Sequence, residues 1–366
     1  MTGSLANRTR LTSQVSLLSS EVGVHVSDNA PIDLWEEYCR KQAGAELFHD
    51  WRWGKVIRDT HRYAPIYLTA TQRGETVGTL MLMDVKSSLF GRSLVSVAFT
   101  VGGGILADTS EAAAALAHQA WEEGEQRGVK HVELRSNSYR LPGWVARQGA
   151  YVGFTKTLPR SADEALKSIP RKRRAEVRKA MKFAQEGRVR VNLDADLETF
   201  YRLYAYSLRG LGTPVFAKSY IKAIKEAFGN RVRFSVVEGD GVPCVGLCTF
   251  YFRDRVMPYY IGMTEAARGF RAGDLVYWQL MEDAVANGHS VFDFGRSKVG
   301  SPHELYKKTW GFEPVPLDYQ YALIDSEDVP NISPSNPKFA LATKVWQRLP
   351  LWAANRLGPV VARNLA

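Results

Sequence analysis

Residues suited to chemistry gather near the end of the sequence, in Val291–Phe312, which reads VFDFGRSKVGSPHELYKKTWGF. The stretch brings one carboxylate, Asp293, together with a Gly-Arg-Ser turn and the adjacent cations Lys307 and Lys308. No Ser-His-Asp order, metal-ligand spacing or P-loop accompanies them. The composition therefore indicates either a site that holds an anionic group or a strand, a turn and a helix without chemistry.

The pattern predicts a strand, a turn and a short helix in this stretch. VFDF alternates as a buried strand that puts Asp293 on the face opposite its two phenylalanines. Gly295 then permits a sharp turn, and HELYKKTWGF is a short helix that ends near Gly311. The turn lifts a predicted substrate-binding rim beyond the strand end: Arg296, Ser297 and Lys298.

Several residues could accept the proton of an attacking group. Asp293 is one candidate, although it could equally be a counter-ion that orients Arg296. Tyr260 is a second catalytic candidate, and its neighbour Tyr259 is predicted to bind substrate. Two histidines that flank the stretch, His289 and His303, have a suitable side-chain pKa for a general base.

A second group of cations precedes a predicted helix, in GMTEAARGFRAGDLVYWQL. Free backbone N–H groups and the helix dipole favour an anion at a helix start. Arg268, Arg271 and Gly273 are therefore predicted to hold a phosphate, with a solvated basic loop as the alternative. The matching loop of the first half, GGGILADTSEA, has no cation, and its Asp108 and Glu111 would repel an anion.

A third group of cations lies on the helix IPRKRRAEVRKAMKFAQEG. Arg174, Arg178 and Lys182 recur every four residues and therefore share one face. Val177 and Met181 belong to the opposing apolar stripe, which predicts packing on the second domain. Arg174 and Arg178 are predicted to contact a phosphate. The alternatives are a solvated charged face or a clamp for nucleic acid.

The composition is that of a globular protein with an excess of positive charge. The 366 residues are 45% hydrophobic and 23% charged, with a formal net charge of +10. These values favour two domains and an anionic partner. Three cysteines are too few for a disulfide framework, and no metal site is predicted. Because no signal-peptide pattern or long apolar segment occurs, the protein is predicted to be cytoplasmic.

The two halves repeat one order of elements: antiparallel strands, a long helix and a further strand. A shift of 160 residues places Gly102 on Gly262 and Gly128 on Gly288. This repeat predicts an α/β (α+β) domain that is duplicated. The predicted division is a flexible N-terminus (1–21), a first domain (22–160), a basic linking helix (161–188), a second, catalytic domain (189–326) and a basic amphipathic tail (327–366).

The tail contains no acidic residue from Asn331 onward and carries large apolar residues such as Trp346 and Trp352. Basic helices with tryptophan suit the surface of an anionic membrane. Residues 338–366 are therefore predicted either to contact the inner face of the cytoplasmic membrane peripherally or to pack on protein.

Together these features resemble the Fem-type (FemAB) aminoacyl or peptidyl transferases, which are duplicated GNAT-fold proteins. The resemblance is closest to FemAB-related proteins associated with PEP-CTERM/exosortase systems, which are linked to exopolysaccharide gene clusters. It covers about residues 22–366. The residues that carry it are FDFGRS (Phe292–Ser297), YKKTWGF (Tyr306–Phe312), the IPRKRRAEVRKA helix and the tail LPLWAANRLGPVVARNL.

The resemblance implies two tandem GNAT-like domains and transfer of an acyl group to an amine of a cell-envelope or exopolysaccharide precursor. The donor would be an aminoacyl-tRNA or an acyl-CoA, with no permanently bound cofactor. Lys307, with Lys308, would contact the donor phosphate or the developing oxyanion. The sequence lacks the long helical arm of the staphylococcal-type enzymes, which leaves the use of tRNA open.

Two other functions fit the sequence. An acetyl-CoA-dependent N-acetyltransferase would use the same fold, but the loop at Arg268–Gly273 departs from the usual acetyltransferase glycine spacing. A non-enzymatic protein that binds RNA or an acidic membrane would explain the charge and the basic helix. Against it, stacking aromatic residues are not interleaved with the basic run.

Overall fold

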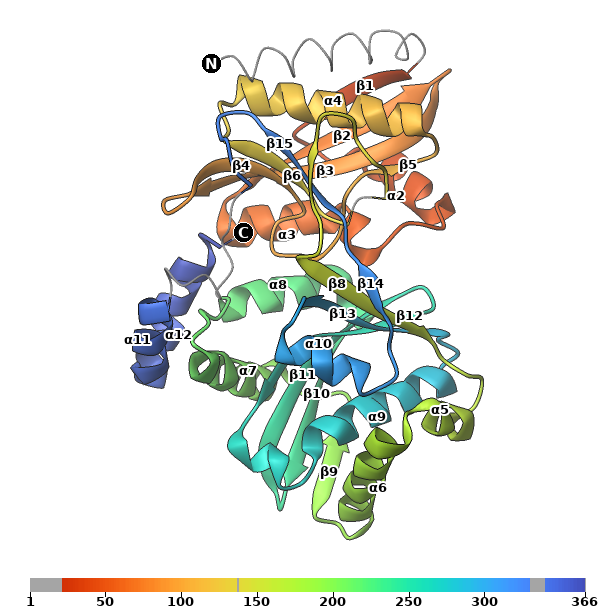
Figure 1. The fold of residues 1–366 in the computed structure, drawn as a ribbon, viewed down its shortest axis with the longest axis vertical. Helices are drawn as coiled ribbons and strands as arrows, with labels where there is room; N and C mark the ends of the chain where they lie inside the picture. Colours follow the sequence, from red (N-terminus) through yellow and green to blue (C-terminus); the bar gives the residue numbers. More distant parts are fainter. Residues whose placement is uncertain (1–21, 137, 330–339, 366) are drawn as a thin grey trace. The chain divides into compact units, whose positions relative to one another are not determined.

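The computed structural model describes residues 22–136, 138–329 and 340–365. The predicted flexible N-terminus (1–21) and residues 330–339 of the predicted tail lie outside this part of the chain. The chain forms two compact units. The first contains Met1–Gly149, Leu317–Asn331 and Arg363–Ala366, and the second contains Ala150–Pro316 and Ile332–Ala362. Each unit is built on one mixed sheet (Figure 1).

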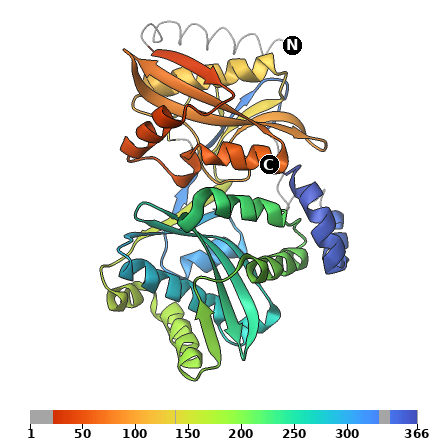
Figure 2. The ribbon, with the colours of Figure 1, turned by 180° about the vertical axis from the view of Figure 1, so that it is seen from behind.

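The first unit packs α4 on one face of its sheet and α2 and α3 on the other (Figures 1 and 2). The core under α4 is aliphatic and closely packed against the helix. The elements are β1 (Val22–Ser27), α2 (Ile32–Lys41), η1 (Leu47–His49), α3 (Arg52–His61), β2 (Ala64–Gln72), β3 (Glu75–Ser87), β4 (Gly91–Ser96), β5 (Leu106–Ala107), α4 (Ser110–Gln126), β6 (His131–Leu134), β7 (Val145–Arg147) and β15 (Tyr319–Leu323).

The second unit packs α7 and α8 on one face of its sheet and α5, α6 and α9 on the other (Figures 1 and 2). Its strands are β8 (Tyr151–Thr157), β9 (Val189–Asn192), β10 (Val232–Gly239), β11 (Val242–Phe252), β12 (Arg255–Met263), β13 (Val291–Lys298) and β14 (Pro314–Pro316). Its helices are α5 (Ala162–Ser168), α6 (Arg171–Gln185), α7 (Leu197–Leu211), α8 (Lys218–Phe228), η2 (Gly229–Arg231), η3 (Glu265–Arg268), α9 (Ala272–Ala286), α10 (Pro302–Lys308), α11 (Ala340–Arg348) and α12 (Leu351–Ala362).

The two sheets have the same strand order. The first runs β1-β2-β3-β4-β6-β15-β7, and the second, read in the same sense, runs β9-β10-β11-β12-β13-β8-β14. In each sheet one pair is parallel, β4 with β6 and β12 with β13. The predicted α/β fold and its duplication are therefore confirmed.

The units exchange strands, so their boundaries differ from the predicted ones. Residues 151–157, predicted to end the first domain, form β8 beside β13 in the second sheet. Residues 319–323, predicted to end the second domain, form β15 beside β6 in the first sheet (Figure 1). Strand β8 alternates more and less buried positions, and β15 is buried at its first four residues, Tyr319 to Ala322. Neither pattern in the sequence identifies the sheet to which the strand belongs.

Local signals in the sequence fix most element ends. The hairpin of β2 and β3 turns at Arg73 and Gly74, both with positive φ, as a two-residue turn between paired strands requires. Helix α4 is capped by Thr109, whose hydroxyl accepts a hydrogen bond from the N–H of Ala112. Pro170 precedes α6 and separates it from α5.

Helix α7 lies unusually close to the second sheet because glycine occupies the strand position beneath it. A Cβ built on Gly262 would stand 2.4 Å from the backbone oxygen of Leu203 and from the Cα of Tyr204. Backbone atoms of a packed helix cannot move aside as a flexible side chain can. The absence of a side chain at Gly262 therefore sets how closely α7 approaches β12.

Replacing Gly262 should destabilise the second unit. We expect Gly262→Ala to lower the free energy of unfolding by at least about 2 kcal/mol, because the added methyl group overpacks the helix–sheet contact. Gly210→Ala is the matched control, since a Cβ there meets no atom within 4 Å. It should leave stability unchanged or slightly raised. Urea unfolding measures both, and equal stabilities for the two variants would contradict the packing argument.

Candidate functional site

The candidate site lies where two parallel strands diverge. Among the described residues, β12 and β13 pair at only two positions, Arg255 with Val291 and Val256 with Phe292. Beyond these positions β13 pairs with β8 and β12 with β11. Parallel strands that separate toward their carboxyl ends leave room for a ligand between them.

A bulge in β12 turns two neighbouring tyrosines toward this opening. Cys248 of β11 pairs with Tyr260 and Thr249 pairs with Pro258, so the register between the two strands steps over Tyr259. In a regular strand, adjacent side chains point to opposite faces. The extra residue breaks this alternation, and both Tyr259 and Tyr260 line the pocket that the divergence leaves.

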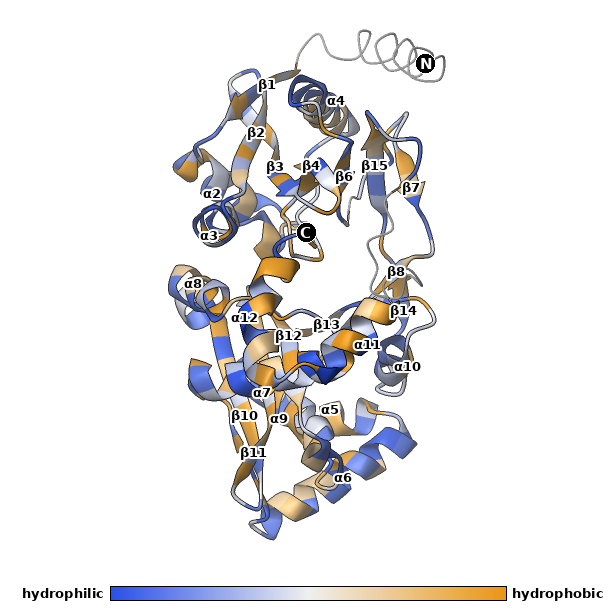
Figure 3. Ribbon diagram, turned by 90° about the vertical axis from the view of Figure 1, so that its left-hand side faces the viewer, coloured by the Kyte–Doolittle hydropathy of each residue, from blue (hydrophilic) through white to orange (hydrophobic). Residues whose placement is uncertain are grey.

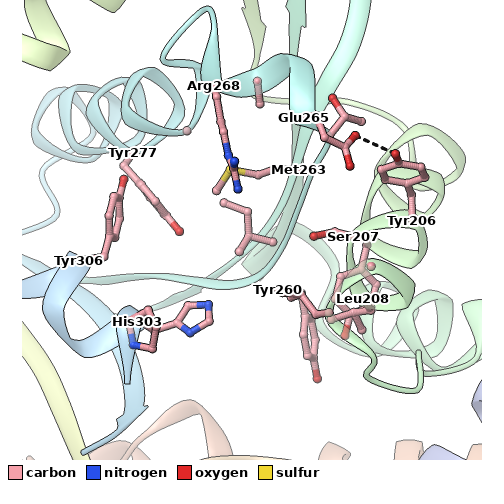
Figure 4. A pocket seen from close by; sticks show the side chains of 18 of the residues that line it. Tyr206, Ser207, Leu208, Tyr260, Met263, Glu265, Arg268, Tyr277, His303 and Tyr306 are labelled. Carbon is pink, nitrogen blue, oxygen red and sulfur yellow. Dashed lines mark hydrogen bonds between the residues drawn. The ribbon is translucent and has the colours of Figure 1, made fainter. Parts of the chain in front are cut away.

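The pocket has a volume of about 1000 Å³ and lies within the second unit (Figure 4). This volume suits a cofactor-sized ligand. Its walls come from β12, η3, the start of α9, and parts of α6, α7 and α10. The lining residues are Arg173, Tyr204, Tyr206, Ser207, Leu208, Arg209, Gly210, Leu211, Tyr259, Tyr260, Ile261, Met263, Thr264, Glu265, Ala267, Arg268, Arg271, Gly273, Asp274, Tyr277, Pro302, His303 and Tyr306.

The start of α9 forms the cationic wall. Arg271 caps the helix with φ 53° and ψ 31°, a left-handed conformation in which glycine is usual. Its backbone oxygen accepts the N–H groups of Asp274 and Leu275, and its guanidinium pairs with Glu176 of α6 at 3.0 Å. The side chain of Arg268 extends from η3 into the pocket (Figure 4). The three residues predicted to hold a phosphate, Arg268, Arg271 and Gly273, thus line one pocket.

A buried network joins three helices beneath this wall. Arg173 of α6 donates to a carboxylate oxygen of Asp274 on α9 at 2.6 Å. The hydroxyl of Tyr306 on α10 donates to the same oxygen at 2.9 Å. The guanidinium also lies over the Tyr306 ring, 4.7 Å from its centroid. Burial, and then the Asp274 charge, raise the pKa of Tyr306, so this phenol stays protonated as a donor.

The opposite wall is aromatic and comes from α7 and β12. Tyr206 donates its hydroxyl to Glu265 at 2.8 Å (Figure 4), and this bond raises the pKa of Tyr206 and lowers that of Glu265. Tyr204 and Tyr260 pack with ring centroids 5.5 Å apart. Burial raises the pKa of Tyr260 well above its usual value. Tyr260 therefore remains a phenol and is a poor proton acceptor unless substrate changes its surroundings.

His303 is the histidine that the structure places at the pocket. It extends from α10 toward the cavity (Figure 4). Burial, followed by the charge of Lys307, lowers its pKa, which favours the neutral imidazole that a general base requires. The other predicted candidate, His289, is not among the lining residues and packs 5.4 Å from the ring of Tyr251.

Asp293 and Lys307 are not among the lining residues. The Asp293 carboxylate accepts from Arg255 at 2.8 Å and from the N–H of Gly295 at 2.7 Å. Asp293 thus forms its ion pair with Arg255, whereas the sequence offered Arg296 as a possible partner. The Lys307 ammonium donates to the backbone oxygens of Gly295 and Arg296 at 3.2 and 3.0 Å.

The surroundings of Lys307 make its charge costly. Its pKa is lowered to about 8, chiefly by burial; the charge of Asp293 opposes this shift, and the positive charge of Arg296 adds to it. The ammonium also lies 5.4 Å from the centroid of the Phe154 ring. Lys307 follows the pocket-lining Tyr306 in sequence, and its hydrogen bonds to Gly295 and Arg296 hold α10 against the second half of β13.

The other predicted residues of β13 and α10 also lie outside the lining. Arg296 lies over the ring of Tyr151, 4.3 Å from its centroid, and Lys308 pairs with Glu304 at 2.6 Å. Ser297 is buried, and its hydroxyl has no hydrogen-bond partner among the described residues. Lys298 is exposed. The structure therefore separates this predicted rim from the Arg268–Gly273 loop.

On α6 the pocket-lining cation is Arg173, whereas Arg174 and Arg178 were predicted. Arg174 donates to the backbone oxygen of Lys167 at 2.8 Å, and Arg178 is exposed. A signal for Arg173 was present in the sequence. It precedes the buried Val177 by four residues and so continues the apolar stripe. A cation on the buried face of a helix needs a partner, and that partner is Asp274.

Within the described ranges, no group of three or more His, Cys, Asp or Glu side chains is placed to hold a metal ion. In the same residues, no helix combines the length and apolar character needed to cross a membrane.

Comparison with known proteins defines the class. Residues 171–308, which contain all the residues that line the pocket, match the acetyltransferase (GNAT) domain family. The chain is therefore an acyltransferase with a GNAT domain in its second unit, and this match argues against the non-enzymatic alternative. No curated protein gives a significant match to the sequence.

Solved structures extend the likeness to both units at the level of the fold. FemX is 14% identical, with a TM-score of 0.61 over 82% of this chain and 98% of that one. A tandem GNAT protein from the clavulanic acid biosynthesis pathway is 13% identical, with a TM-score of 0.52 over 82% and 98%. The C-terminal domain of a putative lysylphosphatidylglycerol synthetase from Agrobacterium fabrum is 12% identical, with a TM-score of 0.52 over 81% and 92%. The FemAB-like resemblance is thus supported as a fold.

Removing Arg173 should destabilise the unit. In Arg173→Ala the largely buried Asp274 carboxylate loses its cation, so we expect the free energy of unfolding to fall by about 3 kcal/mol. Arg178→Ala, on the exposed face of the same helix, is the control and should change it by less than about 0.5 kcal/mol. Urea denaturation measures both values. Similar small losses in the two variants would show that Arg173 does not stabilise the network.

Lys307 should make stability depend on pH. Its pKa is about 8 in the folded chain and 10.5 when unperturbed, so the unfolded chain binds more protons between these values. The free energy of unfolding should therefore rise with pH across this window in the wild type relative to Lys307→Met. Lys179→Met, which removes an exposed ammonium, is the control. Curves for wild type and Lys307→Met that run parallel from pH 8 to 10.5 would exclude the lowered pKa.

Proposed function

We propose that the second unit transfers an acyl group from an activated donor to an amine, with both substrates in the pocket between α9 and α7. The main support for this proposal is that one pocket is lined both by the cationic start of α9 and by aromatic side chains of α7 and β12. Arg268 and the first N–H groups of α9 suit the phosphate of a donor. The aromatic wall suits the apolar parts of the acyl group or of the acceptor.

The reaction needs positioning and one proton acceptor. The amine nitrogen forms a bond to the acyl carbonyl carbon, the bond to the donor's leaving group breaks, and the amine proton passes to a base while the leaving group takes up a proton. Neutral His303 suits the role of base. The contact of Lys307 with the donor phosphate or the oxyanion stays a prediction, and it would require the ammonium to leave the carbonyls of Gly295 and Arg296.

The donor in this proposal is an aminoacyl-tRNA or an acyl-CoA, consumed as a substrate. The fold shared with FemX supports the first, and the basic side of α6 with Arg178 and Lys182 could follow a nucleic-acid backbone. The GNAT family match supports the second, and with it the narrower function of an acetyl-CoA-dependent N-acetyltransferase. Against that narrower function, the loop at Arg268–Gly273 departs from the glycine spacing usual in acetyltransferases.

The acceptor in this proposal is a cell-envelope or exopolysaccharide precursor, in a PEP-CTERM/exosortase-associated system. The sequence resemblance is its support, together with a fold shared with a putative lysylphosphatidylglycerol synthetase domain. Chemical analysis of the surface polysaccharide, with and without this protein, tests it. Loss of an amine-linked acyl substituent is expected, and an unchanged polysaccharide would contradict the proposed setting.

Arg268 is the residue on which the donor assignment depends. Purified protein mixed with aminoacyl-tRNA, acyl-CoA and envelope precursors should consume one of the donors. Arg268→Ala should raise the KM for that donor about tenfold or more, because a charge-assisted contact to phosphate is lost. Arg202→Ala, an exposed arginine of α7 that is not among the lining residues, is the control. If Arg268→Ala transfers at the wild-type KM and kcat, the pocket is not the donor site.

A further inference from the structure

Helices α11 and α12 of the tail pack against α7, whose last residues line the pocket. The Gln347 side chain donates to the backbone oxygen of Gly210 at 3.2 Å, and Arg209 donates to the backbone oxygen of Gln347 at 3.1 Å. A Cβ built on Gly358 would stand 3.0 Å from the backbone of Val215. Arg209, Gly210 and Leu211 also line the pocket. The same end of α7 therefore contacts the tail helices and forms part of the pocket wall.

The side of the tail turned away from α7 is apolar and exposed. Leu341 and Val345 of α11 are 75% and 55% exposed, and Trp352 and Val360 of α12 are 73% and 64% exposed. Spacings of four and eight residues put each pair on one helix face. Figure 3 shows apolar and polar residues alternating along both helices. Leu211, at the rim of the pocket, is also 55% exposed.

Cations surround these apolar residues. Lys344 and Arg348 are exposed on α11 beside Leu341 and Val345, and Arg356 is exposed on α12 between Trp352 and Val360. Residues 340–365 contain no acidic residue. The exposed apolar side chains and these cations together form the tail face: Leu341, Lys344, Val345, Arg348, Trp352, Arg356, Leu357 and Val360.

We propose that the tail face binds the surface of an anionic lipid bilayer. Its apolar side chains would enter the boundary between head groups and acyl chains, and its cations would pair with lipid phosphates. A second copy of this chain fits less well, because a two-fold contact would bring two acid-free cationic faces together. RNA alone would leave Leu341, Trp352 and Val360 in water.

The proposal narrows the class of acceptor, and this step rests on the proposed function. A bilayer that contacts α11 and α12 would lie beside the α7 wall of the pocket. Residues 209–211 of α7 line the pocket, and Arg209 also bonds to α11. An amine acceptor that carries a lipid anchor would then reach the pocket from the membrane surface. Membrane binding and acyl transfer to such an acceptor would be served by one stretch of chain.

Flotation of the full chain with vesicles tests the binding. Vesicles of phosphatidylcholine with phosphatidylglycerol should carry the protein, vesicles of phosphatidylcholine alone should carry much less, and added salt should weaken binding. The triple variant Lys344→Gln, Arg348→Gln, Arg356→Gln should lose affinity about 100-fold, and Trp352→Ser about tenfold. Lys222→Gln and Val242→Ser, an exposed cation and an exposed apolar residue of the same unit, are the controls and should bind like wild type.

Several outcomes would overturn the proposal. Equal flotation with both kinds of vesicle, or unchanged flotation of the tail variants, removes the tail face as the contact. The proposal also fails if the protein does not bind vesicles but forms a concentration-dependent dimer that Trp352→Ser dissociates. It fails likewise if the protein binds RNA and does not bind vesicles. Acyl transfer to a water-soluble and to a lipid-anchored amine acceptor is measured in parallel. Transfer without vesicle binding refutes only this inference, and vesicle binding without transfer refutes only the proposed function.

Discussion

The short parallel pairing of β12 with β13 is the constraint on which the site depends. Two paired positions hold the strands together at their start, and the later residues of β13 pair with β8. Beyond these positions β12 continues to pair with β11 on its other side, and a bulge in that pairing at Tyr259 accompanies the placement of Tyr259 and Tyr260 in the pocket lining. The aromatic core around Phe292 and Phe294 keeps the start of β13 in place.

Ion pairs between helices then give the opening its electrostatic character. Arg271 with Glu176 and Arg173 with Asp274 both join α6 to the start of α9. Each pair neutralises one cation of the pocket, whereas Arg268 forms no ion pair with another residue in the described part of the chain. The charge offered to a ligand is therefore smaller than the count of arginines suggests. Asp274 is buried, so separating it from Arg173 would leave its carboxylate charge buried without an opposite charge. This cost holds the cationic wall in one geometry.

The sequence was sufficient for what depends on local patterns and insufficient for what depends on pairing between distant segments. The loop Arg268–Gly273 could be placed at a helix start, because glycines and an apolar helix mark that boundary. The role of α7 could not, because Tyr204 and Tyr206 read as ordinary helix residues until β12 is known to bulge toward them. Asp293 and Lys307 looked available in the sequence, but their partners Arg255 and the carbonyl of Gly295 become neighbours only in the fold.

The two units differ at the place where the second unit has its pocket. In the first unit β4 and β6 also pair at two positions, but the chain after β4 turns through Val97 and Phe99, both with positive φ, and is buried. Arg135, beyond β6, donates to the backbone oxygen of Thr100 and pairs with Glu133. The segment after β4 thus binds along the continuation of β6, where the second unit has its pocket. A β-branched residue in a left-handed conformation is strained, so the packing of this segment must outweigh that strain, and a ligand would have to displace it.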